Sequence, residues 1–250
     1  LPYEWRAGAG DVLVFQNVLP AEYAGLTMGF SSGGARVRVL LDGEAIYQYD
    51  PQKEAGKNYG DHENFVDMPK TFRDGEVRIE LTGEEAGAAA VLGKIRIETR
   101  DMVVIGVMGN NIADIGCCLL IVIMAIIMFV LALIRRYTNY PDRGEIYLGL
   151  TGLAAGIYCF IGTDTLSIFY DVQEAYEMQE YLVLLLPLFL TLYFERNLHA
   201  RYPRRFSALL CCVSINAALQ IALQISGICY LEEMVNVSAA SVGAVFVTAI

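Results

Sequence analysis

Cysteine is absent from the first 114 residues of this chain of 250 residues, and histidine occurs only twice, as His62 and His199. A polar half without cysteine has no disulfide framework, and two isolated histidines do not assemble a metal site. Neither of the glycine-rich phosphate-binding patterns GxGxxG and GxxxxGK[ST] occurs in the sequence, so no nucleotide-binding loop is indicated. We therefore expect no metal and no cofactor. The six cysteines all lie in or beside later apolar segments, where they are expected to be small apolar filler: Cys117, Cys118, Cys159, Cys211, Cys212 and Cys229.

Charge and proline are missing from residues 115–134, a run of twenty residues. At about 1.5 Å of rise per residue, a helix of this length spans roughly the 30 Å hydrocarbon thickness of a bilayer. A helix that is apolar all round has no face for water, which excludes a surface helix. Arg135 and Arg136 follow at once, as positive charges often do at the cytoplasmic end of a span. The run predicts a membrane helix that divides the chain in two.

The half before this run is acidic. Residues 1–114 hold eleven of the 18 Lys and Arg but eighteen of the 28 Asp and Glu. An acidic surface argues against nucleic-acid binding. The chain begins at Leu1 and stops within an apolar run at Ile250, so we expect a fragment whose helical part is truncated.

Short alternating apolar patterns in the acidic half predict β-strands. In ARVRVLL (residues 35–41), every second residue is apolar, which is typical of a half-buried strand. Asp42-Gly43 predicts a turn, and residues 45–49 the partner strand of a hairpin. Residues 50–63 are expected to form a loop. Further strands are predicted at residues 11–18, 26–32, 65–68, 76–81 and 94–98. About seven such strands favour a β-sandwich, jelly-roll-like, over residues 1–100, and an α+β multidomain membrane protein overall.

Tyr59 and His62 are the candidate ligand-binding residues of this β half. They lie in the predicted loop, together with aromatics nearby that suit sugar rings, and rim loops of sandwiches often bind ligands. The alternative is that the aromatics are core and that Tyr59 and His62 belong to a solvated loop. No arrangement of serine and histidine forms a credible nucleophile, and no catalytic residue is assigned.

Four complete spans and part of a fifth are predicted in the second half, as a polytopic bundle over residues 115–250: residues 115–134, 146–163, 181–194, 206–228 and 238–250. Residues 101–114 are expected to be a juxtamembrane connector. Gly152 and Gly156 make a small-xxx-small face for helix packing. Pro187 is expected to kink its span or lie against a neighbour.

Asn216, Gln220 and Gln224 recur every four residues in the fourth predicted span and share one helix face. Unpaired amides in lipid are costly, so this face is expected to point into the bundle. It could form a polar pocket or signal relay, or it could simply bond neighbouring helices. No acidic or basic residue lies deep in any predicted span, which weakens a proton- or ion-coupled transporter.

Five segments resemble a known family. They are VLLDGEAIYQYD (39–50), FVDMPKTFRDGEVRIEL (65–81), EIYLGLTGLAAGIY (145–158), the span around Pro187 with FER (194–196), and ALQIALQISGI (218–228). The chain resembles bacterial seven-transmembrane receptors with diverse intracellular signalling modules, in the subset with an extracellular galactose-binding-like β-sandwich. None of the segments is a catalytic signature; they are patterns of turns and helix ends.

The resemblance implies a sensory receptor in the bacterial plasma membrane. Its β domain would meet an extracytoplasmic small molecule, carbohydrate or protein, and its output domain would follow the helices, most commonly a diguanylate cyclase (GGDEF) domain. A histidine kinase or phosphodiesterase is a further option for the output, and a homodimer is left open. The alternative functions are a transporter or channel subunit with an accessory β domain, and a membrane enzyme whose site lies at the interface.

Charge bias predicts the topology. Residues 135–145 and 195–205 hold seven arginines, whereas residues 164–180 hold no Lys or Arg. The positive-inside rule places the two arginine-rich loops in the cytoplasm and residues 1–114 outside it. Reporter fusions after Gly144 and after Glu177 should report opposite sides of the membrane. If both reporters lie on the same side, this topology is wrong.

Overall fold

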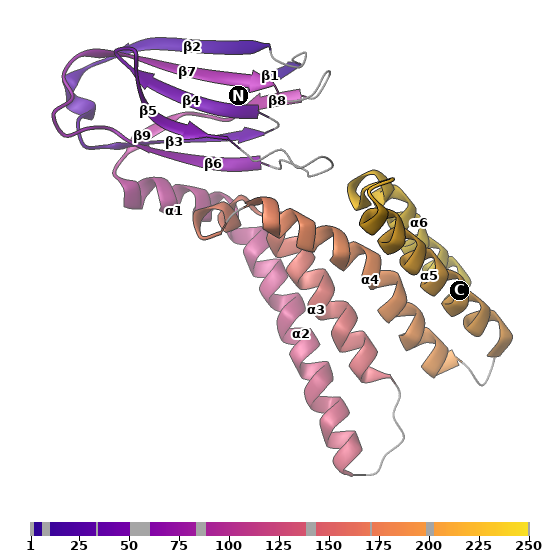
Figure 1. The fold of residues 1–250 in the computed structure, drawn as a ribbon. Coiled ribbons are helices and arrows are strands. Elements are labelled where there is room, and N and C mark those ends of the chain that lie inside the picture. The colour runs from indigo at the N-terminus through magenta and orange to yellow at the C-terminus, as the bar shows by residue number, and fades with distance from the viewer. Residues whose placement is uncertain are drawn as a thin grey trace. The chain divides into compact units, whose positions relative to one another are not determined.

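The computed structural model describes residues 3–6, 11–33, 35–50, 61–83, 89–138, 144–170, 172–198 and 203–249. An N-terminal region of two antiparallel sheets is followed by helices (Figure 1). The described residues up to Ile112, together with Asp164–Gln173, form one compact unit, which we call the β unit. The helices outside it form a second compact unit, the helical unit.

The β unit has nine strands among its described residues. They are β1 (Tyr3–Arg6), β2 (Val12–Leu19), β3 (Thr27–Gly33), β4 (Ala35–Leu41), β5 (Glu44–Tyr49), β6 (Asp61–Asp67), β7 (Gly75–Gly83), β8 (Ala89–Leu92) and β9 (Arg96–Glu98). Sheet A has the order β1-β8-β3-β6, with β9 also paired to β3, and sheet B has the order β2-β7-β4-β5. The antiparallel pairs are nested, because β1 pairs with β8, β2 with β7, β3 with β6, and β4 with β5.

Alternation in the sequence explains how the two sheets share a core. Every second residue of β4 and β7 is buried, and these residues meet inward-facing residues of β3, β6 and β8 in one cluster. The cluster includes Met28 and Phe30 from sheet A and Val37 and Leu81 from sheet B. Side chains of a strand alternate between its faces, so the outer positions stay polar. The predicted strand at residues 35–41 is confirmed.

The hairpin between β4 and β5 is confirmed as well. Asp42 and Gly43 both have positive φ, of 48° and 86°, as a two-residue turn between twisted strands requires. The Asp42 carboxylate also accepts a hydrogen bond from the Glu76 backbone N–H at 2.8 Å, which ties the turn to β7.

The structure corrects two features of the predicted β half. Residues 61–63 are not loop but the first part of β6, and they pair with Gly33, Ser32 and Ser31 of β3. This pairing across the sheet outweighs their polar composition. The described part of the chain has nine strands where about seven were predicted, because the short strands β1 and β8 have no alternating pattern long enough to recognise.

One buried amide links the two sheets at their β5 and β6 edges. Asn64, with 0% of its surface exposed, donates to the Phe30 carbonyl (3.2 Å), the Ser32 hydroxyl (2.8 Å) and the His62 carbonyl (3.2 Å). Its carbonyl oxygen accepts a bond from the Tyr47 hydroxyl at 3.1 Å. Burial raises the pKa of Tyr47 to about 12, so this phenol remains a donor across the physiological range.

Among the described residues, six α-helices and one 3₁₀ helix follow the strands: α1 (Arg100–Asn110), α2 (Ile112–Tyr137), α3 (Glu145–Ile161), η2 (Asp164–Ile168), α4 (Val172–Leu198), α5 (Pro203–Ser226) and α6 (Leu231–Ala249). Three of them contain stretches long and apolar enough to cross a membrane, namely Ile112–Tyr137, Ala175–Leu198 and Arg204–Ser226. Two shorter apolar stretches are Glu145–Ile161 and Glu233–Thr248. The predicted connector at residues 101–114 contains α1 and the start of α2.

Small residues allow α3 to approach α2 closely within the helical unit. A Cβ on Gly156 would lie 2.7 Å from Val122 Cγ2, and one on Gly152 would lie 3.2 Å from Ala125 Cβ. The predicted glycine face therefore contacts a neighbouring helix. Pro187 lies inside α4, where the Thr191 hydroxyl donates to its carbonyl at 2.6 Å. Leu184 and Leu190 of α4 pack in two clusters with residues of α5 and α6.

Replacing Asn64 with alanine should weaken the β unit by about 2–3 kcal/mol, because four hydrogen bonds, two of them buried, lose their partner. The free energy of opening, measured by hydrogen exchange at the β3 and β6 amides, should fall by that amount. Asn17→Ala is the matched control, since Asn17 is exposed and its side chain accepts a local bond from the Val18 N–H. Equal effects of the two variants would contradict a structural role for Asn64.

Candidate ligand pocket on the β unit

Helix α1 lies on the outer face of sheet A, where Val103 and Val107 are buried with 1% and 6% of their surfaces exposed. Gly29 of β3 makes this possible. A Cβ added at Gly29 would overlap Val103 Cγ1, so any larger residue there pushes the helix away. Gly106 of α1 faces the end of the Arg96 side chain of β9, because a Cβ at Gly106 would overlap Arg96 Nη1.

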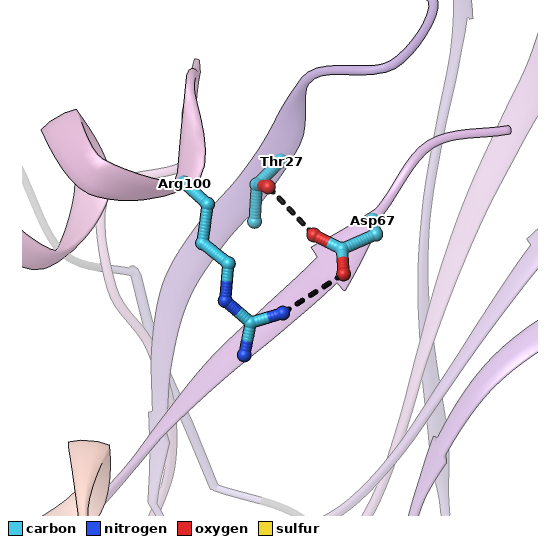
Figure 2. A network of polar contacts seen from close by, with 3 residues as sticks. All are labelled: Thr27, Asp67 and Arg100. Carbon is cyan, nitrogen blue, oxygen red and sulfur yellow. Dashed lines mark hydrogen bonds and ion pairs between the residues drawn. The ribbon is translucent and has the colours of Figure 1, made fainter. Parts of the chain in front are cut away.

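A polar network anchors the first residue of α1 to the sheet (Figure 2). Arg100 Nη1 donates to Asp67 Oδ2 of β6 at 2.9 Å, and Thr27 of β3 donates to Asp67 Oδ1 at 2.6 Å. The side chains of Arg100 and Asp67 are more than half exposed, so the ion pair contributes at most about 1 kcal/mol. The buried valines hold α1 more firmly than this pair does.

Asn111 and the 3₁₀ helix η2 complete the outer layer of the β unit. Helix η2 contacts β6 and α1. Asn111, only 9% exposed, follows the last residue of α1 and donates to the Val107 carbonyl at 3.0 Å and to Asp164 Oδ2 at 3.5 Å. The segment that connects α3 to α4 is therefore part of the β unit.

A cavity of about 160 Å³ lies beneath this outer layer. Its lining comes from β3, from the neighbouring strands β6 and β9, from the connection that precedes β9, and from α1 and η2. The lining residues are Gly29, Ser31, Glu63, Lys94, Arg96, Val103, Val107, Asn110 and Asp164. We call it the α1 pocket. It carries two basic and two acidic side chains, two hydrogen-bonding groups and an apolar wall formed by two valines. Neither cysteine nor histidine is among the described residues that line it.

The loop residues predicted to bind a ligand are not in this pocket. Tyr59 lies outside the described residues. His62 points toward the interior between the sheets and stacks on Tyr49, with ring centroids 3.9 Å apart and planes inclined by 3°. None of the described residues that line the α1 pocket is aromatic.

The polar face of α5 is directed at α6 within the helical unit. Asn216 Nδ2 lies 3.3 Å from the Ser241 hydroxyl, Gln220 Oε1 accepts from Ser238 at 2.9 Å, and Gln224 Oε1 accepts from the Leu231 N–H at 2.8 Å. Gln220 is 2% exposed, and its Nε2 has no hydrogen-bond partner among the described residues. These contacts favour the interpretation that the face bonds two helices; whether it also relays a signal stays a hypothesis.

Comparison with known proteins adds no relative. No family model matches the chain, and no curated protein matches it. Within the described residues, no group of three His, Cys, Asp or Glu side chains could hold a metal ion.

Sequence reasoning missed all the charged residues of the α1 pocket. Lys94 and Arg96 belong to a predicted strand, and Glu63 belongs to a predicted loop. Asp164 belongs to a connection between predicted spans, nearly seventy residues after Arg96 in the chain. Only the pairing of strands and the position of η2 bring these four residues together.

Gln220→Leu should reduce the stability of the helical unit by about 1 kcal/mol or less. The variant loses the bond from Ser238 but also removes a buried N–H group that lacks a partner, and the two effects partly offset each other. Thermal unfolding in detergent measures the change, with Ser214→Leu, at an exposed position of α5, as control. Normal membrane abundance with lost or constitutive cytoplasmic output of the full-length protein would instead indicate a relay.

Proposed function

We propose that this chain is the sensing and transmembrane part of a membrane receptor, in which the β unit binds an extracytoplasmic ligand and the helices carry the signal inward. One observation carries the proposal. The α1 pocket is lined both by sheet A and by the two segments that lead directly into the apolar helices. A ligand in this pocket touches the sensor and the connections at once.

Both connections are short. Only Asn111 separates the end of α1 from the start of α2, and η2 ends at Ile168, four residues before α4 begins at Val172. A ligand that binds one arrangement of α1 and η2 on sheet A more tightly than another shifts the equilibrium toward that arrangement. The size of the shift is set by the difference between its affinities for the two arrangements. With so few residues between, such a shift reaches the first turns of α2 and α4 rather than being lost in a flexible linker.

The proposed topology has α2 to α6 as membrane spans, with the β unit outside the cytoplasm. The arginine bias of the loops supports it. The inclusion of Asp164–Gln173 in the β unit supports it independently, because the loop that has no Lys or Arg then lies on the same side as the β unit. The three long apolar helices support a membrane location, and α3 and α6 are the shorter proposed spans.

The resemblance to seven-transmembrane receptors with a galactose-binding-like domain remains part of the proposal. The nested pairing of β1 to β8 follows from winding one long hairpin into two sheets, which is the jelly-roll arrangement that such a sandwich requires. In this proposal the output domain, a diguanylate cyclase by preference, belongs to the full-length protein beyond residue 250. Any catalytic residues would belong to that domain.

Gly29→Ala tests the coupling, because its new methyl group collides with Val103 and must displace α1. Overpacking of this kind costs about 1–3 kcal/mol. Hydrogen exchange in the full chain should rise roughly tenfold in α1 and also rise in the first turns of α2 and α4. Gly109→Ala, in α1 but with no atom within 4 Å of the added Cβ, is the matched control and should leave these helices unchanged. Increased exchange confined to α1 would rule out the relay.

A further inference from the structure

Strand β2 lies at one edge of sheet B, where β7 is the one described strand that pairs with it (Figure 1). Its sequence, VLVFQNVL, contains no charged residue and no proline. The other described edge strands, β1, β5, β6 and β9, each carry at least one charge. Natural sheets block their open edges with charge or proline, because an unpaired edge is a template for another strand. The lack of both in β2 indicates an edge that is paired when the protein is assembled.

The register of β2 with β7 shows which backbone groups are directed outward. The Gly83 N–H donates to the Asp11 carbonyl at 3.1 Å, and Val12 is paired with Thr82. Hydrogen-bonded and non-hydrogen-bonded pairs alternate along antiparallel strands, so the odd-numbered residues of β2 bond to β7. The even-numbered residues direct their N–H and C=O groups away from β7. These outward residues are Val12, Val14, Gln16 and Val18.

The same outward residues expose apolar side chains on the outer face of sheet B. Val12, Val14 and Val18 are 51%, 38% and 65% exposed. On the inner face, Leu13 and Phe15 pack at the margin of the core and are only half-buried. Side chains on neighbouring strands of a sheet lie side by side on each face. A further strand beside β2 would therefore cover both sets of side chains as well as the open backbone.

We propose that β2 pairs antiparallel with β2 of a second copy of this chain, which joins two B sheets into one continuous sheet. Identical antiparallel strands are related by a two-fold axis, so this edge is its own partner. Outward residues pair with outward residues, and the full-length register places Val14 opposite Gln16 of the second copy. It also places Val12 opposite Val18, whose N–H already donates to the Asn17 side chain at 2.9 Å.

The charges of β7 favour this register over its neighbours. On the outer face, Glu80 is paired with Val14 and Arg78 with Gln16, and the two charged side chains form an ion pair at 2.9 Å. In the full-length register, Glu80 of one copy and Arg78 of the other lie in the same row across the joined sheet. A slip of two residues in either direction would instead align Glu80 with Glu80, or Arg78 with Arg78. The edge is complementary in charge to itself, which argues for a second copy rather than an unrelated strand.

A membrane would compensate for the modest size of this contact. One pair of strands of eight residues is smaller than the interfaces that hold obligate dimers together. Three helices that are long and apolar enough to cross a membrane would confine both copies to it, which raises their effective concentration. Main-chain hydrogen bonds between the strands supply the affinity. The inference goes beyond the proposed receptor function, since it requires neither a ligand nor a relay.

Energy transfer between full chains fused to donor and acceptor fluorescent proteins tests the pairing, in liposomes over a range of protein-to-lipid ratios. The wild-type chain should show saturable transfer. Val14→Lys should raise the ratio needed for half-maximal transfer at least tenfold, because two like charges then lie at diagonal positions across the axis. Val14→Thr, which adds no charge, should change it less than threefold. Gln48→Lys, which adds the same charge on β5 at the opposite edge of sheet B, should also change it less than threefold.

A mixture of Val14→Lys donors with Val14→Glu acceptors separates lost pairing from lost folding. Transfer should return toward the wild-type value, because opposite charges then meet across the axis. Hydrogen exchange of the Val14 and Gln16 amides should slow as the wild-type dimer forms. Three results would overturn the dimer: no transfer between wild-type chains, transfer that Val14→Lys leaves unchanged, and a mixture that restores nothing.

Discussion

The close approach of α1 to β3 at Gly29 is the constraint on which the β unit's outer layer depends. Because Gly29 has no side chain, Val103 can seat against the sheet and bury nearly all of its surface. That contact fixes the height of α1 above sheet A, and with it the room for the Arg96 guanidinium beneath Gly106. A single methyl group at Gly29 would displace the wall of the α1 pocket. The pocket is thus a consequence of one absent side chain.

Local patterns predicted the central strands of the β unit well. β4 and β5 alternate clearly and are joined by Asp42-Gly43, so a few neighbouring residues specify both the strands and their turn. β1 and β8 have four residues each, and what makes them strands is their pairing across more than eighty residues of chain. Residues 61–63 are similar, because their partner β3 decides their conformation and their composition does not. Long-range pairing of this kind leaves no local signal.

The residues of the α1 pocket could not be predicted from the sequence for the same reason. The aromatic residues of the predicted loop favoured Tyr59 and His62 as ligand-binding residues. His62 lies between the sheets against Tyr49, and Tyr59 is outside the described residues. The position of Glu63 and Arg96 on the same face of sheet A depends on a register that joins three strands. In contrast, the four-residue spacing of Asn216, Gln220 and Gln224 did place them on one face, because a helix sets that geometry by itself.

The way in which α1 is held decides what kind of motion it can transmit. The ion pair of Arg100 with Asp67 is exposed and contributes little, so the first turn of the helix is weakly held. Burial of Val103 and Val107 contributes about 1.5–3 kcal/mol for each side chain. Detaching the helix would expose both valines, at a cost well above that of breaking the ion pair. A signal transmitted through α1 is therefore a small shift or tilt of the helix about the Gly29 contact, during which the helix stays packed on sheet A.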